Sequence, residues 1–335
     1  MKRRLVPVVV GLATLVGLFM VIQPGAVVTA LRGTDLRLVG AAMLVTALYY
    51  VIQGVRWHFL LREAGVRLRL HESVLINLAG QTVTAVLPLG DLTRALFASE
   101  ATGAPFGAAA AAVTVQELTF TSLLILSATP ALVGIPGGWL ISGLVLGGVA
   151  GVLVILIVPG VFRRVRALIG RIPLVRRSAG QIDTLRDETV TLLTRPVAML
   201  SGVIDLLRVG LAALAMALIL RALNVQLGWW PVVLTVAVAY LGGALSFLPG
   251  GIGANELTII GVLSGFGVPH APALAAALLE RIALTGVPSA VGLLAYIAIH
   301  RRLHLGGLIT SPRAVHAAAG GGVAAGGAGA CEAVA

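Results

Sequence analysis

The chain has 335 residues, of which 58% are hydrophobic and only 11% are charged, and its formal net charge is +11. Soluble domains carry about 25% charged residues, so this composition excludes a water-covered globular protein and predicts an all-helical membrane protein. The basic excess is almost wholly Arg, with Lys2 as the single Lys, and it lies between apolar segments. That placement is the positive-inside pattern and argues against binding of nucleic acid.

The chain begins with the basic segment Met1–Arg4, which leads into an apolar run. A membrane-spanning helix needs about 20 apolar residues, and no small-residue cleavage site follows this run, so we expect a retained first span. Five later segments are also long and apolar enough, and the last contains Pro288, which predicts a kink. The predicted spans are Leu5–Gln23, Leu38–Val55, Gly107–Val133, Trp139–Val161, Val197–Leu223 and Ala271–His300.

Arg residues place the predicted loops relative to the membrane. Met1–Arg4, Arg56–Glu72 and Phe162–Pro196 are rich in Arg, and Arg301 and Arg302 follow the last predicted span. All four regions are therefore expected to be cytoplasmic, with both termini on that side of a bacterial inner membrane. We expect a short amphipathic helix on the cytoplasmic leaflet within Phe162–Pro196.

Tryptophans and the C-terminal tail complete this topology. Trp57 suits an inner aromatic belt, whereas Trp139, Trp229 and Trp230 suit an outer one. Residues 1–304 are expected to form one transmembrane domain, followed by a disordered Gly/Ala-rich tail at 305–335.

Two further apolar segments, Ser73–Pro105 and Trp230–Pro269, are each interrupted near the middle by Pro, Gly and charged residues. With the loops oriented as above, the first must return to the cytoplasm and the second to the outside. Both are then predicted to be re-entrant helical hairpins that enter from opposite faces and leave a central cavity. Eight plain spans, instead of six spans and two hairpins, remain the alternative.

The two interrupted segments resemble each other. The first contains LPLGD at Leu87–Asp91 and then GAP, and the second contains LPGGIG at Leu248–Gly253 and then GVP, each followed by an Ala-rich helix. Interrupted helices at matching places in two halves indicate an inverted repeat of the transporter type. The predicted hinge and turn residues are Pro88, Gly90, Pro249, Gly250, Gly251 and Gly253.

Polar and charged residues inside membrane segments are candidates for substrate binding, because burying them in lipid is costly. Arg94 follows the first break and could grip an anion, or it could pair with Asp91 or Glu256. The full candidate set is Gln81, Asp91, Arg94, Gln116, Glu117, Asp205, Arg208, Asn255, Glu256, Glu280 and Arg281.

Several of these candidates have structural alternatives. Asp205 and Arg208 lie three residues apart on one helical face and can neutralise each other. Glu280 and Arg281 are adjacent and project about 100° apart, so one of them is expected to pair with another helix. Glu117 could be a buried, protonated carboxyl.

Motifs for other chemistry are missing from the sequence. The Gly-rich turn at Pro249–Gly253 lacks the Lys-Ser/Thr of a phosphate-binding loop, so we expect no ATP hydrolysis. The His residues have no metal-ligand spacing, no nucleophile–base motif is evident, and Cys331 is the single cysteine. We therefore expect no metal, no cofactor, no catalytic residue and no enzyme activity.

The segments LPLGDLTRA, SFLPGGIGANE and GVPHAPALAAALLER resemble the membrane domain of lysylphosphatidylglycerol synthases, and the resemblance extends over about Arg4–Arg302. It implies movement of a lipid with a charged head group between leaflets. We expect no counterpart of the synthases' separate catalytic domain, so no transferase activity is implied. The first break is shorter than the family's usual turn, and Gln116-Glu117 stands where Glu-Arg is common, which puts the identity of the lipid in question.

The sequence therefore favours a lipid flippase or scramblase that works without ATP, with anionic or lipid-linked membrane lipids as its partners. Glu117, Glu256 or Glu280 could carry a coupling proton. A transporter of a small soluble solute, and a non-transporting partner of a lipid-modifying enzyme docked at Phe162–Pro196, are the alternatives. Homo-oligomers are compatible with the sequence as well.

Overall fold

The computed structural model describes residues 24–85, 91–133, 137–169, 179–246 and 248–300. Within these ranges every regular element is a helix, and five helices are long and apolar enough to cross a membrane. The prediction of an all-helical, multi-pass membrane protein is thereby confirmed. The predicted first span Leu5–Gln23 and the tail 305–335 lie outside the described residues.

The long helices agree with the predicted spans in position. They are α3 (Leu36–Glu63), α6 (Phe106–Ala128, continued by a 3₁₀ turn Thr129–Leu132), α7 (Gly138–Ile157), α12 (Gly202–Ala222, preceded by α11, Pro196–Leu200), and α15 (His270–Arg281) with α16 (Val287–Ile299). A π-helical segment, Ile282–Gly286, joins α15 to α16 and ends two residues before Pro288. The irregularity expected at that proline is therefore present.

Helices α3 and α12 pack along each other in opposite directions and form the centre of the bundle. The backbone N–H of Asp35 donates to the carbonyl of Ala222 at 3.0 Å, which ties the start of α3 to the end of α12. At the other end, Arg195 lies 3.9 Å from Glu63. Small residues of α12 such as Ala212 and Ala213 are buried in the core, and small residues permit the close approach on which helix packing in lipid depends.

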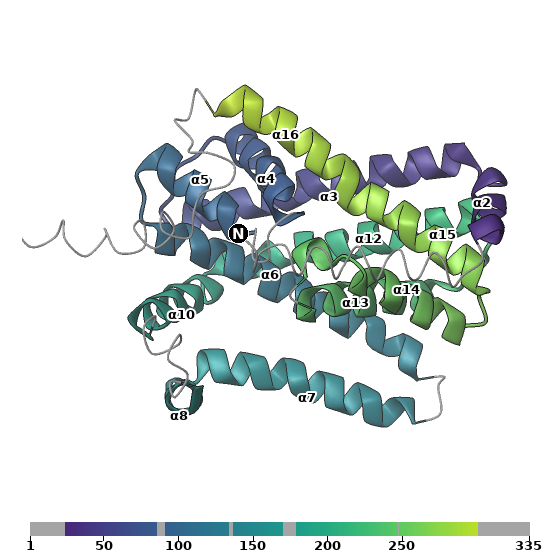
Figure 1. The fold of residues 1–335 in the computed structure, drawn as a ribbon. Coiled ribbons are helices and arrows are strands. Elements are labelled where there is room, and N and C mark those ends of the chain that lie inside the picture. The colour runs from purple at the N-terminus through teal and green to yellow at the C-terminus, as the bar shows by residue number, and fades with distance from the viewer. Residues whose placement is uncertain (1–23, 86–90, 134–136, 170–178, 247, 301–335) are drawn as a thin grey trace, which may run out of the picture.

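Both interrupted segments form pairs of short helices, which are called the first and the second hairpin below. The first pair is α4 (Leu70–Thr84) with α5 (Leu92–Thr102), and the second is α13 (Trp229–Leu245) with α14 (Ala254–Gly265). In Figure 1 the two pairs extend into the bundle from opposite ends. Their inner ends meet, because a Cβ on Gly250 would lie only 2.9 Å from the carbonyl oxygen of Ala85.

Helix α16 holds the first pair in place by packing against α4. Gly292 is buried directly against the backbone of Leu78, where a side chain would have no room. Beside it, Thr82 Oγ1 donates to the carbonyl of Ser289 at 2.8 Å. The first hairpin is therefore fixed to the last membrane-spanning unit of the chain.

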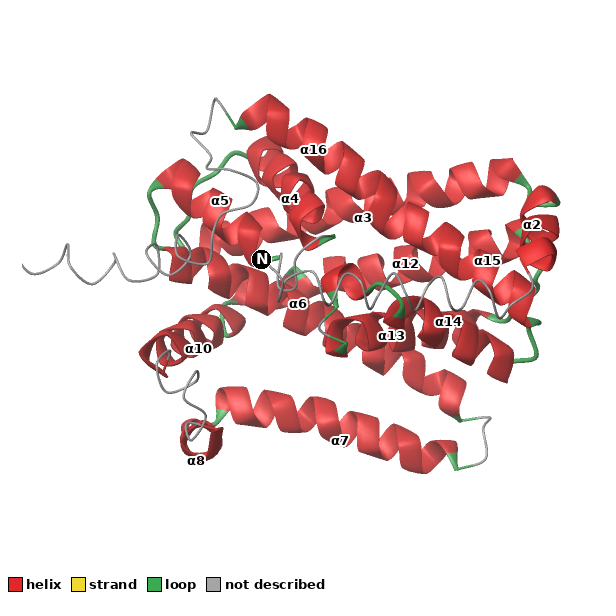
Figure 2. Cartoon of the chain, in the orientation of Figure 1, coloured by secondary structure: helices red, strands yellow, loops and turns green. Residues whose placement is uncertain are grey.

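Helix α7 stands apart from the rest of the bundle (Figure 2). Only Gly138 of this helix is buried, and large side chains such as Leu144 are exposed along it, as expected for a helix surrounded by lipid. Two helices follow it, α8 (Pro159–Ile169) and α10 (Ala179–Leu193). Where the sequence predicted one short amphipathic helix, the described residues thus hold two, and α10 packs against α6.

The structure corrects the predicted start of the first Arg-rich loop. Helix α3 continues to Glu63, so Arg56 and Trp57 lie within a membrane-spanning helix, and both are 0% exposed. Arg56 can be buried there because Asp205 neutralises it at 3.1 Å. Trp57 therefore belongs to the core and not to an inner aromatic belt. Trp139, Trp229 and Trp230 are exposed, and their place in an outer belt stays a prediction. Helix α2 (Pro24–Arg32) packs against α15.

Candidate functional site

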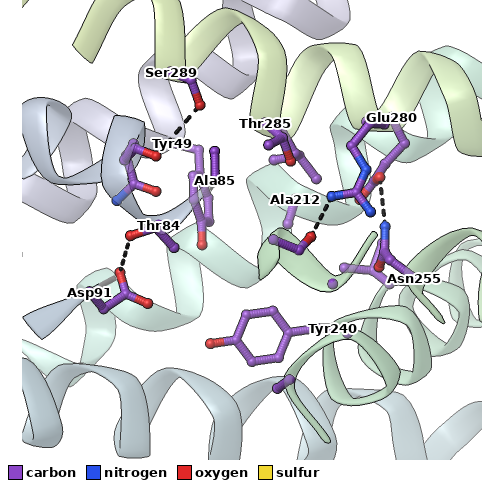
Figure 3. A pocket seen from close by; sticks show the side chains of 18 of the residues that line it. Tyr49, Thr84, Ala85, Asp91, Ala212, Tyr240, Asn255, Glu280, Thr285 and Ser289 are labelled. Carbon is purple, nitrogen blue, oxygen red and sulfur yellow. Dashed lines mark hydrogen bonds between the residues drawn. The ribbon is translucent and has the colours of Figure 1, made fainter. Parts of the chain in front are cut away.

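A cavity of about 360 Å³ lies where the inner ends of the two hairpins meet. Its wall includes residues of both hairpins and of α3, α6, α12, α15 and α16. Figure 3 shows polar side chains on two sides of this space, with Thr84 and Asp91 on one side and Asn255 and Glu280 on the other. The first hairpin thus contributes the carboxylate of Asp91 to the cavity. The second contributes Asn255, which donates a hydrogen bond to the carboxylate of Glu280.

On the first side, the polar groups come from the end of α4 and the start of α5. Thr84 Oγ1 lies 3.4 Å from Asp91 Oδ1, and the nearest cation, Arg94, lies 3.9 Å from the same oxygen. Gln81 is 9% exposed, and its Nε2 has no hydrogen-bond partner within the described structure. This side therefore offers a loosely bonded carboxylate and an unused amide donor.

On the second side, Asn255 Nδ2 donates to Glu280 Oε2 at 3.0 Å. Arg281 Nε lies 2.5 Å from Glu256 Oε1, and Arg281 Nη1 donates to the carbonyl of Gly250. The remaining terminal nitrogen of Arg281, Nη2, is buried without a partner among the described atoms. Glu280 and Arg281 thus diverge as predicted, and Arg281 pairs with another helix.

The second break has the backbone that its glycines allow. Gly250, Gly251 and Gly253 have φ values of +56°, +64° and +87°, which residues with a Cβ rarely adopt. The N–H of Gly253 donates to Glu256 Oε2 at 2.7 Å and closes the start of α14. These glycines are turn residues, as predicted. Pro88 and Gly90 lie outside the described residues.

Tyrosines complete the cavity, and the sequence analysis missed them. Tyr50 Oη donates to the carbonyl of Leu284 at 2.6 Å, and Tyr240 Oη donates to Glu117 Oε2 at 3.1 Å. Tyr240 points into the space between the two polar sides (Figure 3). The search for candidates concentrated on charged and amide side chains. The only signal for Tyr240 was its position nine residues before the second break, at Pro249.

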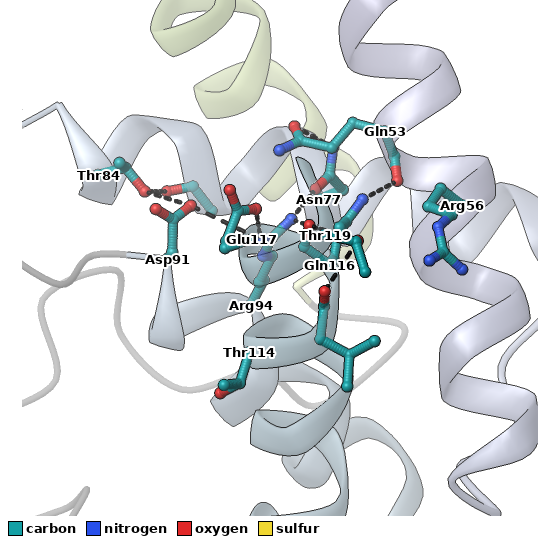
Figure 4. A network of polar contacts seen from close by, with 12 residues as sticks. Gln53, Arg56, Asn77, Thr84, Asp91, Arg94, Thr114, Gln116, Glu117 and Thr119 are labelled. Atoms are coloured by element: carbon teal, nitrogen blue, oxygen red, sulfur yellow. Dashed lines mark hydrogen bonds and ion pairs between the residues drawn. The ribbon is translucent and has the colours of Figure 1, made fainter. Parts of the chain in front are cut away.

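Arg94 lies behind the cavity wall at the centre of a polar network (Figure 4). It is 0% exposed, and Nη1 donates to Asn77 Oδ1 at 2.7 Å and to Gln116 Oε1 at 3.2 Å. Its Nη2 lies 2.6 Å from Glu117 Oε1. The predicted alternative of an Arg94–Glu256 pair is wrong, because Glu256 is bound by Arg281. Glu117 is an ion-paired carboxyl and not an isolated one.

A second buried network surrounds Asp205. Its two oxygens bind Arg208 Nη1 at 2.9 Å and Arg56 Nε at 3.1 Å, and Arg208 Nη2 donates to Tyr49 Oη at 3.0 Å. Thr119 also donates to Asp205, at 2.6 Å. Asp205 and Arg208 neutralise each other, the alternative that the sequence left open, and Arg56 is a partner that it did not identify.

The predicted substrate-binding residues therefore divide into two groups. Five of them line the cavity: Gln81, Asp91, Asn255, Glu280 and Arg281. The rest are not part of its lining, and they form the supporting networks: Arg94, Gln116, Glu117, Asp205, Arg208 and Glu256. The networks hold α3, α5, α6, α12 and α14 in register around the cavity.

Comparison with known proteins agrees with this picture of a membrane protein. The family model described as the lysylphosphatidylglycerol synthase TM region matches residues 8–292. No curated relative matches the chain. The match includes both hairpins and the cavity between them.

Proposed function

Because the chain belongs to the lysylphosphatidylglycerol synthase TM region family, we propose that it moves a lipid with a charged head group between the two leaflets of a membrane. The movement needs no ATP hydrolysis and no covalent chemistry by this chain. The observation that carries the proposal is the cavity at the meeting point of the two hairpins, lined by Asp91, Glu280 and Arg281.

Charged groups around an internal cavity support a transport path. Ionisable residues inside membrane proteins are costly, and they mark substrate and ion pathways. The two hairpins, which extend from opposite ends of the bundle, support an inverted repeat with re-entrant segments. In such transporters the substrate site lies near the midplane at the interface of the repeats.

The volume of the cavity favours a head group over a whole lipid. Pockets for drug-sized ligands measure about 300–1,000 Å³, and this cavity, at about 360 Å³, lies near the lower limit. A polar head group fits such a space, whereas two acyl chains do not. The chains therefore stay in the surrounding lipid while the head group passes through the protein.

Two unused donors suit the phosphate of a head group. Arg281 Nη2 and Gln81 Nε2 are buried without partners, and both residues line the cavity. Arg can bind phosphate oxygens through its planar group of donors. A bound phosphate would remove the energetic penalty of leaving these two donors unpaired. In this proposal Arg281, and not Arg94, is the residue that contacts the anion.

The distribution of charge supports a bacterial inner-membrane location with the end that carries α8 and α10 in the cytoplasm. Arg163, Arg164 and Arg166 lie on α8, and Arg186 and Arg195 follow on or near α10. Cytoplasmic loops carry such an excess of Arg. The proposal includes the predicted topology, in which both termini are cytoplasmic.

Reconstitution into vesicles tests the proposal. Labelled anionic and zwitterionic lipids are expected to exchange between leaflets faster with the protein than in empty vesicles. Ala244→Phe adds a ring at an exposed position of the cavity lining and is expected to abolish the acceleration. Ala150→Phe adds the same bulk on the exposed surface of α7 and is expected to leave it unchanged.

Two results would count against lipid movement. One is an exchange rate equal to that of empty vesicles for every lipid tested. The other is uptake of a soluble phosphate compound that Ala244→Phe blocks while lipid exchange stays at background, which would instead indicate a transporter of a soluble solute.

A further inference from the structure

We infer that transport through this cavity is coupled to protons and that Glu280 is the residue that carries the proton; the inference rests on the proposed transport function. Glu280 lines the cavity and is 8% exposed, and Asn255 Nδ2, at 3.0 Å, is its single hydrogen-bond donor among the residues that the structure describes. Figure 3 shows this contact at the cavity wall.

The other two glutamates in the core already have cations. Glu117 lies 2.6 Å from Arg94, and Glu256 lies 2.5 Å from Arg281. Among the described residues, no basic group lies within 4 Å of the Glu280 carboxylate. An ion pair stabilises the charged form of a carboxylate and leaves little reason to take up a proton, whereas burial without a cation favours the neutral acid.

Asp91 is the other carboxylate in the cavity, and its setting differs. Its side chain is 37% exposed, and Arg94 lies 3.9 Å away. The nearby cation favours the ionised form of Asp91, so we assign the fixed negative charge to Asp91. Glu280 is the better site for reversible protonation.

The charged and titratable groups on the helices around Glu280 are consistent with reversible protonation of its carboxylate. On α15 itself, Arg281 is the nearest cation; its guanidinium binds Glu256 of α14, whose negative charge opposes that of Arg281 at Glu280. From α3, Tyr50 uses its hydroxyl to bond to the carbonyl of Leu284.

More distant charges are already neutralised or face solvent. On α12, Asp205 and Arg208 bind each other, and on α2, Arg32 is exposed. Across the cavity, Tyr240 donates to Glu117. None of these described groups provides a competing cation for Glu280.

The backbone beside Glu280 can support a change of position. The π-helical segment begins at Ile282, two residues after Glu280, and single π-helical turns within α-helices occur frequently at functional sites. In one state, a carboxylate oxygen of Glu280 takes a proton from a hydronium ion that enters the cavity; an O–H bond forms at Glu280, an O–H bond of the hydronium ion breaks, and water is left. In the other state, the O–H bond at Glu280 breaks, the proton leaves to water at the opposite face, and the carboxylate again accepts from Asn255.

A pH gradient across reconstituted vesicles tests the inference. With one proton moved per lipid, the steady-state ratio of labelled lipid between leaflets shifts about tenfold for each pH unit of the gradient. A pH-sensitive dye inside the vesicles should report proton movement that depends on the presence of the lipid.

Glu280→Gln imitates the protonated side chain and keeps an oxygen for Asn255, so the fold should be retained. This variant is expected to lose both the shift of the lipid ratio with pH and the proton flux, and its ratio is read once lipid exchange has reached a steady state. Glu63→Gln removes a carboxyl at the end of α3, outside the cavity lining, and should behave as the wild type.

The outcomes separate this inference from the proposed function. If the wild type exchanges lipid but the ratio ignores the gradient, or if Glu280→Gln keeps the shift, proton coupling through Glu280 is overturned and lipid movement stands. If the wild type exchanges no lipid, infrared spectra decide. A protonated-carboxyl band that titrates in the wild type and is missing in Glu280→Gln supports the proton site, and a band unchanged by the substitution refutes it.

Discussion

Arg94 Nη2 lies 2.6 Å from Glu117 Oε1, and this contact ties the returning helix of the first hairpin to the membrane-spanning helix α6. The guanidinium is fully buried, whereas the carboxylate is 24% exposed. The position of α5 against α6 therefore depends on a charge pair of which only the Glu117 side is partly exposed.

Removing one member of this pair is expected to destabilise the protein strongly. Arg94→Leu leaves Glu117 without its cation, and such a loss costs about 3–5 kcal/mol for a fully buried pair. Because Glu117 is partly exposed, we expect the loss of stability to lie near the lower limit of this range. Thermal unfolding in detergent measures it. The double variant Arg94→Leu/Glu117→Leu should be more stable than Arg94→Leu alone, and equal stability would contradict the pairing.

Replacement of Asp205 is expected to destabilise the protein more than replacement of Arg94. Asp205→Asn leaves both Arg56 and Arg208 without a carboxylate, and all three side chains are 0% exposed. We expect a loss of at least about 3–5 kcal/mol or a failure to accumulate in the membrane. Asp183→Asn is the control. It breaks a pair with Arg166 at 2.9 Å whose side chains are more than a third exposed, which should cost about 0–1 kcal/mol.

Gly292 is expected to tolerate no side chain. Gly292→Ala places a methyl group against the backbone of Leu78 and the hydroxyl of Thr82, and such overpacking costs about 1–3 kcal/mol. Gly261→Ala, on the exposed face of α14, meets nothing within 4 Å. Thermal stability should fall for the first variant and not for the second. A similar loss in both would show that α4 and α16 do not pack this closely.

The proposed orientation can be measured with single cysteines in a Cys331→Ser background. Thr184→Cys lies on the exposed side of α10, and Gln226→Cys lies in the exposed turn between α12 and α13. In intact cells, an impermeant maleimide should label the cysteine at 226 and not the one at 184. Labelling in the reverse pattern would overturn the assignment of the Arg-rich end to the cytoplasm.

The sequence predicted where the helices lie better than what their side chains contact. Long apolar runs and the breaks near Asp91 and Pro249 have strong local signals, because lipid demands about 20 apolar residues for each crossing. The partners of Arg94 and Arg281 had no such signal. They depend on how far each helix is rotated and on which helices are neighbours, and both are set by packing of the whole bundle.

Arg56 shows that a local sequence signal can also mislead. A charged residue at the end of an apolar run normally marks the beginning of a loop, and the sequence was interpreted in that way. Its counter-charge, Asp205, lies 149 residues further along the chain. Only the packing of α12 against α3 makes a buried arginine acceptable at this depth.

The separate position of α7 has a consequence for how the protein is made. As a very apolar helix with a single buried residue, α7 can partition into the bilayer as soon as it leaves the ribosome. Helix α5 cannot do the same, because Arg94 is synthesised before Glu117 and has only the longer 3.9 Å contact with Asp91 until α6 follows. Insertion of the first hairpin must therefore wait for α6, which is translated after it, whereas insertion of α7 depends on no later helix.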